Sequence, residues 1–292
     1  MIVNITKTYR GYQNFERAQR GDVDMLGSFV VRVRPTKSVC YQYSTGRPLH
    51  GLFLHLIERV NRPLARELHD AKGQKPFTVS PLFGHFLTES GAKRAVEEEE
   101  YWFRFTALTE ECCEALVRVF YGEAIANATV MIEETPFLIT AIDLAVGGRR
   151  GWSGLLSYDD LISAANGEPE ITLCFQTPTT FRQGKINYVL PDPNLVFGSL
   201  LRKWNAYAPK KIPQEIKNFI FERVGVSQYR LSSRPYDLGD HSLIGFQGKC
   251  KYTVLGDQNE MTRYLNILAD FAFFAGLGQK TTMGMGQVRR VG

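Results

Sequence analysis

The sequence predicts an α+β protein built from two tandem ferredoxin-like domains, each with an antiparallel sheet. The first observation is the order of hydrophobic patterns along residues 28–145, which is strand, helix, strand, strand, helix, strand. The second is a glycine-rich break at residues 147–154, after which a similar order recurs. The third is composition, because 292 residues with 44% hydrophobic and 22% charged side chains match an ordinary globular protein of one large or two smaller domains.

The first half opens on a strand. Residues 28–35 (SFVVRVRP) alternate apolar and polar side chains, whereas residues 49–60 place apolar side chains at helical spacing, with Pro48 suited to a first turn. Asn61 is a candidate N-cap for a short second helix, RPLARELHD. Strand patterns follow at 75–84 and 101–108. A helix pattern covers 109–122, with Gly122 as its stop, and two further strand patterns precede the glycine-rich break.

The second half repeats this order. Residues 170–181 predict a strand, and two helices follow in NLVFGSLLRKWNAY and PQEIKNFIFERV. GVSQYRLSS and SLIGFQGKCKYTVLG predict paired strands, residues 259–276 a helix, and residues 286–291 a last strand. We therefore expect an N-terminal arm or extra segment at 1–26, a first domain at 27–165 and a second at 166–292.

The remaining composition restricts the class of protein. Five cysteines without a CxxC pair argue against a disulfide framework and a cysteine zinc site. No apolar run is long enough to span a membrane, and the polar N-terminus lacks the apolar region of a signal peptide, so we expect a cytoplasmic protein. A formal charge of +5 permits an anionic partner.

A glycine-rich segment near the C-terminus is the most distinctive motif. Four glycines fall within residues 276–286, at Gly276, Gly278, Gly284 and Gly286, around Lys280, Thr281 and Thr282. A dinucleotide fingerprint would open a helix, but here a helix precedes the segment and a strand follows, and no GxxxxGK[ST] motif is present. A tight turn after a helix is the simpler interpretation. Four glycines with Lys-Thr-Thr between them favour a loop whose backbone approaches a partner and whose donors meet phosphate oxygens.

Three stretches together resemble a known family. The stretches are GLGQKTTMGMGQV between the last helix and the last strand, HGLFLHLIERVNRPLARELHDAKGQKPFTVSPLFG (50–84), and FQTPTTFRQG followed by LVFGSLLRKWN. They are similar to the Cas-six CRISPR RNA-processing endoribonucleases of the RAMP superfamily. The resemblance covers most of residues 28–292. It implies metal-independent cleavage of CRISPR repeat precursor RNA by a 2′-hydroxyl, which leaves a 2′,3′-cyclic phosphate and a 5′-hydroxyl.

The same resemblance implies a set of catalytic residues. The family's histidine positions, at the start of the first helix and at the far end of the helical region, correspond to His50 and His69. A lysine in the following loop of some members corresponds to Lys75, whereas the helical tyrosine of some relatives is replaced here by Leu54. This departure weakens a Tyr–His–Lys trio and favours an arrangement of two histidines.

The chemistry of the residues agrees with this interpretation. Histidine can act as base or acid near neutral pH, and a cation stabilises the developing phosphate charge. His50 and His55 flank the apolar stripe of their helix, and His69 lies beside a loop with Lys72 and Lys75. A metal hydrolase would want an HExxH-like cluster and a serine hydrolase a GxSxG, and neither is present. We therefore expect no metal and no cofactor.

The expected partner is CRISPR repeat RNA. Besides the glycine-loop residues, we predict RNA contacts from Arg182, Lys185, Lys249, Arg289 and Arg290. The protein could act as a monomer or a homodimer and could associate with a CRISPR effector complex. A non-catalytic RNA-binding subunit of such a complex is the alternative function, and it would not need His50 or His69. A small-molecule enzyme of ferredoxin-like fold is a third possibility that the sequence leaves open.

Overall fold

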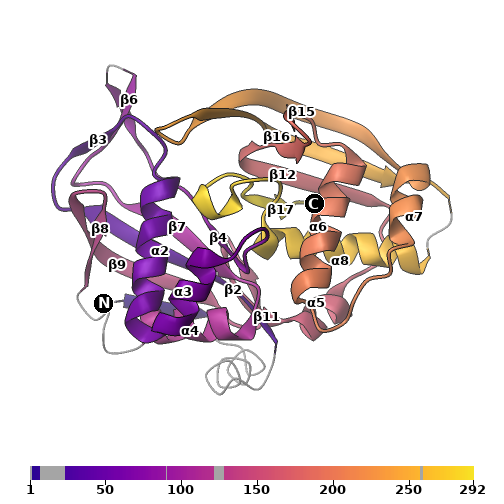
Figure 1. Cartoon of the computed structure of the whole chain (residues 1–292), viewed down its shortest axis with the longest axis horizontal. Helices are drawn as coiled ribbons and strands as arrows, with labels where there is room; N and C mark the ends of the chain where they lie inside the picture. Colours follow the sequence, from indigo (N-terminus) through magenta and orange to yellow (C-terminus); the bar gives the residue numbers. More distant parts are fainter. Residues whose placement is uncertain (1, 7–23, 90, 122–127, 257–258) are drawn as a thin grey trace. The chain divides into compact units, whose positions relative to one another are not determined.

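The computed structural model describes residues 2–6, 24–89, 91–121, 128–256 and 259–292 (Figure 1). The chain forms two compact units. The first comprises residues 1–157, 238–240 and 282–284, and the second comprises residues 158–237, 241–281 and 285–292. Within the described residues, no helix is both long and apolar enough to cross a membrane.

The first unit contains a ferredoxin-like sheet. Its four central strands run antiparallel in the order β9–β2–β7–β4, which is the order expected when the split βαβ pattern folds into one sheet. Further strands extend this sheet, and a separate three-stranded sheet has the order β3–β6–β5. The strands of the first unit are β1 (Ile2–Thr6), β2 (Met25–Pro35), β3 (Val39–Tyr41), β4 (Phe77–Val79), β5 (Leu87–Glu89), β6 (Ala92–Ala95), β7 (Tyr101–Ala107), β8 (Thr129–Ile132), β9 (Thr135–Ala145), β10 (Gly148–Arg150) and β11 (Ser153–Ser157).

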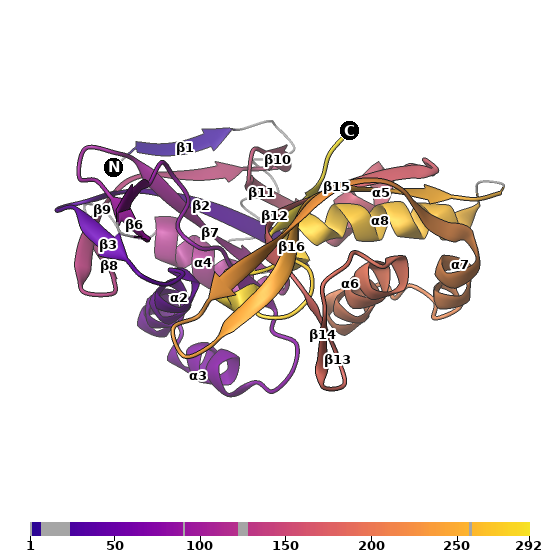
Figure 2. The ribbon, with the colours of Figure 1, turned by 90° about the horizontal axis from the view of Figure 1, so that it is seen from above.

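Helices cover one face of this sheet (Figures 1 and 2). They are α2 (Gly46–Val60), α3 (Arg62–Asp70) and α4 (Glu110–Tyr121). The apolar positions of α2 face the core as the spacing predicts, because Leu49, Phe53 and Ile57 are fully buried. The predicted cap is confirmed, since the Asn61 side chain accepts a hydrogen bond from the Leu64 amide at 3.1 Å.

The second unit repeats the topology. Its sheet has the order β15–β16–β12–β17, all antiparallel, so each half of the chain folds as predicted into a ferredoxin-like unit. β15 and β16 form a long hairpin (Figure 2). The elements of this unit are α5 (Tyr158–Ala164), β12 (Glu170–Thr179), β13 (Phe181–Gln183), β14 (Ile186–Tyr188), α6 (Pro193–Tyr207), α7 (Ile216–Arg223), β15 (Val224–Asp237), β16 (Ser242–Val254), α8 (Glu260–Ala275) and β17 (Val288–Arg290).

The limits of the units differ from those expected at two places. Ile2–Thr6, which we assigned to an arm, pairs as a parallel strand with Ala141–Ala145 of β9, and the rest of the arm up to residue 23 lies outside the described residues. The division between the units falls before α5, whereas we predicted a boundary after residue 165. The reason is packing, because α5 contacts α8 of the second unit.

Candidate active site

His50 lies in the second turn of α2 at the edge of the buried face. Its neighbours Leu49 and Phe53 anchor the helix in the core, and the imidazole stacks on Phe77 of β4 with ring centroids 5.7 Å apart. Phe77 in turn stacks on Phe53 at 4.1 Å. One face of the imidazole is therefore held by aromatic packing, and the residue is half-buried.

A single backbone carbonyl sets the protonation pattern of this ring. The Nδ1 atom of His50 lies 3.0 Å from the carbonyl oxygen of Thr282, a residue grouped with the first unit. Because a carbonyl can only accept, Nδ1 carries the proton in this contact, and Nε2 is left with a lone pair when the ring is neutral. Burial, followed by the positive charge of Lys75, holds the pKa of His50 below 6.5, while the Thr282 carbonyl opposes that shift. The neutral ring at pH 7 is thus a proton acceptor at Nε2.

His69 lies at the end of α3 and is open to solvent. Its side chain is 72% exposed, and its Nδ1 lies 2.8 Å from the carboxylate of Asp70. As with His50, an acceptor contacts Nδ1, so Nε2 is the ring nitrogen that remains available to a substrate. Exposure makes this histidine accessible to a large ligand, which a polynucleotide would require.

Lys75 connects the loop after α3 to the end of that helix. Its ammonium donates hydrogen bonds to the carbonyls of Leu68 and His69, the second at 2.9 Å. These carbonyls lie in the last turn of α3, where a cation is favourable. Burial lowers the pKa of Lys75, and the charge of Asp70 opposes that shift.

The structure brings all three predicted catalytic residues into one neighbourhood. The charges of Lys75 and His69 both act on His50 and lower its pKa, so the three groups lie within electrostatic range of each other. His55, in contrast, points to solvent from the opposite edge of α2, and His85 is also exposed. Among the described residues, no three His, Cys, Asp or Glu side chains are grouped closely enough to hold a metal ion.

The glycine-rich loop packs closely against its own unit. We predicted that its glycines let the loop backbone approach a partner. A Cβ at Gly278 would lie 2.3 Å from the Thr180 carbonyl oxygen, and one at Gly286 would lie 1.9 Å from that of Leu277. Both residues also have positive φ, as does Gly284. At Gly278 and Gly286, glycine is therefore required by the packing of the loop against its own unit. An RNA contact from Gly276, Gly278, Gly284 or Gly286 stays a prediction.

The polar residues of the loop are also partly buried or hydrogen-bonded within the protein. Lys280 is half-buried with a φ of 59°, and the Thr281 hydroxyl accepts a hydrogen bond from Lys203 at 3.2 Å. The Leu277 amide donates to the Gly286 carbonyl at 2.9 Å, which closes the base of the loop. These contacts hold the loop against the second unit, whereas Thr282 bonds to His50 within the first.

Two of the predicted RNA-binding cations share one face of the second sheet. In the strand register, Lys249 of β16 lies opposite Arg230 of β15 and Cys174 of β12, and Cys174 lies opposite Arg289 of β17. The three cations therefore form a row across the four strands of the sheet. An open groove of about 680 Å³ is lined by this part of the sheet. Arg290 points to the other face, where it meets Asp270 of α8 at 3.5 Å, so the structure does not support our prediction that it binds RNA.

Arg182 and Lys185 lie apart from this row on the β13–β14 hairpin and are exposed. The guanidinium of Arg182 bonds to the Gly184 carbonyl at 2.9 Å and the Asn187 amide oxygen at 3.1 Å, which stabilises the turn. Asn187 also accepts from the Gln279 side chain at 2.9 Å, so the hairpin is tied to the glycine-rich loop.

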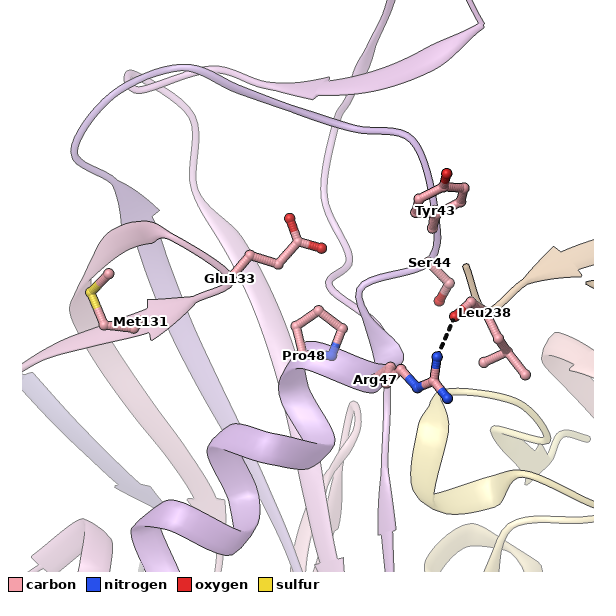
Figure 3. Close-up of a pocket in the computed structure, with 7 residues that line it drawn as sticks. All are labelled: Tyr43, Ser44, Arg47, Pro48, Met131, Glu133 and Leu238. Carbon is pink, nitrogen blue, oxygen red and sulfur yellow. Dashed lines mark hydrogen bonds between the residues drawn. The ribbon is translucent and has the colours of Figure 1, made fainter. Parts of the chain in front are cut away.

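A shallow pocket of about 470 Å³ adjoins the start of α2 (Figure 3). Arg47 turns toward the Leu238 carbonyl at 3.2 Å (Figure 3). It also pairs with Asp240 at 3.0 Å. Tyr43 is exposed at its rim, and the Glu133 carboxylate, whose pKa is raised by burial and by Glu134, is directed over Pro48. Arg47 thus anchors residues 238–240 to the helix that carries His50.

Two family descriptions cover most of the chain. Residues 25–163 match the CRISPR Cas6 N-terminal domain, and residues 173–288 match the CRISPR-associated endoribonuclease Cas6. The chain belongs to the Cas6 family. The family resemblance predicted from the glycine-rich loop and the helix of His50 is thereby confirmed.

Individual Cas6 relatives match this chain over spans of different length. The CRISPR-associated endoribonuclease Cas6 of Mycobacterium tuberculosis is 37% identical over 39% of this chain and 37% of its own length. That of Streptococcus thermophilus is 27% identical over 46% of this chain and 57% of its own length, so the matches span roughly half or less of these relatives. Thermus thermophilus Cas6 superposes with a TM-score of 0.69 and 27% identity over 92% of this chain and 99% of that one. A product complex of that protein reaches a TM-score of 0.75 at 27% identity, over 91% and 99%.

Three structural features near the predicted site residues could not be found from the sequence. Lys203 is buried, and only its position three residues after Leu200 and seven after Val196, on the apolar face of α6, could have indicated it. Arg230 joins the basic row through strand register, which a single sequence does not specify. The Thr282 carbonyl is a backbone group and carries no side-chain signal.

Proposed function

We propose that this Cas6 protein is a metal-independent endoribonuclease that cleaves CRISPR repeat precursor RNA. In this reaction the 2′-hydroxyl attacks the adjacent phosphate, the 5′-oxygen leaves, and the products carry a 2′,3′-cyclic phosphate and a 5′-hydroxyl. The observation that carries the proposal is His50, a neutral imidazole whose Nδ1 is bound by the Thr282 carbonyl. Its membership of the Cas6 family and the endoribonuclease names of its relatives support the same activity.

His50 is suited to the role of general base. Its lowered pKa keeps it unprotonated at neutral pH, and its fixed tautomer presents Nε2 as the acceptor for the 2′-hydroxyl proton. The ring is packed on Phe77, so little orientational freedom is lost when the substrate arrives.

His69 and Lys75 supply the remaining chemistry. His69 is exposed and can donate a proton to the leaving 5′-oxygen while Asp70 accepts from its other nitrogen. The Lys75 ammonium stabilises the negative charge that develops on the phosphate, because it is a fixed cation close to His50. These roles assign base, acid and electrostatic stabiliser to three different side chains.

The basic row of Arg230, Lys249 and Arg289 is the proposed contact for the RNA backbone. Exposed Lys185 and Arg182 on the β13–β14 hairpin extend the list of candidates. Association with a CRISPR effector complex, and a monomeric or homodimeric state, stay predictions.

The decisive experiment incubates the protein with repeat RNA in EDTA. Cleavage is expected, with a 2′,3′-cyclic phosphate on one product, and a single 2′-deoxy substitution before the scissile phosphate should abolish cutting while sparing binding. If the deoxy substrate is still cut, the nucleophile is not the 2′-hydroxyl and the mechanism is wrong.

Histidine variants then assign the roles. His50→Ala and His69→Ala should each lower the rate by about 10² to 10⁴ with near-normal RNA affinity, and His55→Ala on the same helix is the matched control. A wild-type protein that binds repeat RNA tightly without cutting it would instead indicate the alternative, a non-catalytic RNA-binding subunit.

A further inference from the structure

The pocket beside the start of α2 takes no part in the chemistry described above (Figure 3). It has a volume of about 470 Å³, and all of its lining residues belong to the first unit. Its lining combines the apolar side chains of Pro48 and Met131 with the aromatic ring of Tyr43 and the carboxylate of Glu133. A concave apolar surface with a few polar groups is the usual composition of a small-ligand site.

Glu133 stands at a backbone position that normally favours glycine. Ile132 pairs with Thr135 across the β8–β9 hairpin, so Glu133 and Glu134 form its two-residue loop. The φ of Glu133 is 54°, whereas the φ of Glu134 is not positive. This pattern matches a type II′ turn, whose first loop residue is preferably glycine because a side chain there is crowded by the following carbonyl. The protein therefore keeps a carboxylate here against the preference of its own turn, and such strain is characteristic of functional positions.

The carboxylate of Glu133 has no partner in the protein. It is directed over Pro48 (Figure 3), and within the part of the chain that the structure describes it makes no hydrogen bond and no ion pair. The cation that lines the same pocket, Arg47, pairs instead with Asp240 at 3.0 Å. Burial, and then the charge of Glu134, raises the pKa of Glu133 because both disfavour the charged form. An ionised carboxylate can only accept hydrogen bonds, so the ligand that suits this position presents N–H donors.

Tyr43 supplies a surface for a planar ligand. The residue is 54% exposed at the rim of the pocket, and Met131 is 50% exposed. An exposed aromatic ring is a stacking platform for a nucleobase, because every base has a π face. Sequence-specific recognition of unpaired RNA commonly combines such stacking with hydrogen bonds to the Watson–Crick edge of the base. Tyr43 and Glu133 together offer both kinds of contact.

We propose that this pocket binds one guanine base of unpaired RNA, which stacks on Tyr43 and is selected by Glu133. Guanine alone among the four RNA bases presents two adjacent N–H donors, at N1 and N2, which match the two oxygens of a carboxylate. Adenine and cytosine offer one amino group beside an acceptor nitrogen, and uracil places its N–H between two carbonyl oxygens, so each meets repulsion from Glu133.

The position of the pocket connects this selection to the reaction. Pro48 and His50 lie two residues apart on α2, so a guanine held here lies on the helix that carries the proposed base. The inference rests on the proposed function, because it takes RNA as the ligand. It adds a determinant of sequence to a site whose other contacts are with the phosphate and the ribose.

The test uses the methyl group of Met131 as a reporter inside the pocket. Protein labelled with ¹³C at its methionine methyl groups is titrated with the RNA pentamers UUGUU, UUIUU and UUAUU, where I is inosine, whose base lacks the N2 amino group. The Met131 resonance should shift with UUGUU at an affinity about 10-fold higher than with UUIUU, because one hydrogen bond to a charged acceptor is lost. UUAUU should bind no better than UUIUU, and the resonance of Met25, buried in the core of the same unit, should not move.

Substitutions separate the roles of the two residues. Glu133→Gln should remove the preference for UUGUU over UUIUU, whereas Glu134→Gln, the matched control on the same turn, should keep it. Tyr43→Ala should weaken the binding of all three pentamers by about 5-fold to 100-fold, and Tyr43→Phe, which keeps the ring, should rescue binding. Glu133→Gly should lose the preference without lowering the melting temperature, because glycine suits this turn better.

The inference would be overturned if the Met131 resonance did not respond to UUGUU at millimolar concentration. An equal response to all three pentamers, or a preference that survives Glu133→Gln, would overturn it as well. A lower melting temperature for Glu133→Gly would assign Glu133 to the structure of the turn and have the same effect. Failure of the proposed function looks different, because the wild type would then not cut repeat RNA, whereas the pentamer titration, which measures binding alone, would still report the guanine pocket.

Discussion

Replacing Lys203 by methionine should change how stability depends on pH. The amine is buried among apolar neighbours of α6, and this burial lowers its pKa to about 7, against about 10.4 in an unfolded chain. Between these two values the unfolded chain binds more protons than the folded one. The free energy of unfolding therefore rises with pH across this window, and the penalty for burying the charged amine is fully present below pH 7.

The size of the effect follows from the width of the window. Each pH unit within the window raises the free energy of unfolding by about 1.4 kcal/mol, and less near pH 7, where the folded amine is only partly titrated. Between pH 7 and pH 9, the free energy of unfolding of the wild type should therefore rise by about 2 kcal/mol relative to that of Lys203→Met. Urea unfolding of both proteins at several pH values gives this difference, and other titrating groups cancel in the comparison. The control is Arg202→Met. Its free energy of unfolding should differ from that of the wild type by a constant amount across this pH range, because a guanidinium does not titrate here.

The reasoning would be refuted if the difference in free energy of unfolding between wild type and Lys203→Met did not change from pH 7 to pH 9. It would mean that the amine holds the same proton in the folded and unfolded chains, so that an unrecognised counter-charge compensates its burial. A difference that falls with rising pH would have the wrong sign and would refute it equally.

Other predictions concern the site and its support. On the acidic side of a pH–rate profile, the rate of cutting should fall as pH drops through a pKa below 6.5, because burial and Lys75 lower the pKa of His50. Lys75→Met should move that acidic limb to higher pH by removing a nearby cation, whereas exposed Lys72→Met should not. Gly286→Ala should destabilise the protein by several kcal/mol more than Gly184→Ala in thermal unfolding, because both have positive φ but only Gly286 meets a backbone oxygen. RNA affinity should fall by about 0.7 log unit per log unit of salt for each phosphate contact, and Lys249→Gln should reduce that slope by one contact.

Local patterns were sufficient to predict most of the fold. The helical spacing of apolar residues on α2, the capping residue Asn61 and the alternation in β2 are set by nearest neighbours along the chain, and both ferredoxin-like sheets follow from their order. β1 was not predicted as part of the sheet, because its partner Ala141–Ala145 is far away in sequence and pairing over such a distance has no local signature.

The candidate site was predictable only in part for the same physical reason. His50, His69 and Lys75 lie within 26 consecutive residues, so their grouping could be inferred from one helical region. The contact that fixes the His50 tautomer joins positions 232 apart in the chain and uses a backbone oxygen, which no side-chain pattern encodes. Likewise, the sequence shows Lys203 as one more cation, although its burial removes it from the surface that RNA could reach.

The glycine-rich loop includes a residue that contacts His50 as well as the residues predicted to contact RNA. Its glycines let the chain turn back against Thr180 and Leu277 without steric conflict. Within the first unit, the carbonyl of Thr282 bonds to His50. A side chain added at Gly278 would displace the loop from Thr180 even if no RNA were near. A loss of activity in a loop variant is therefore not by itself a measure of lost RNA contact. RNA affinity and the His50 tautomer must both be measured, because only the two together separate a loop that binds from a loop that positions.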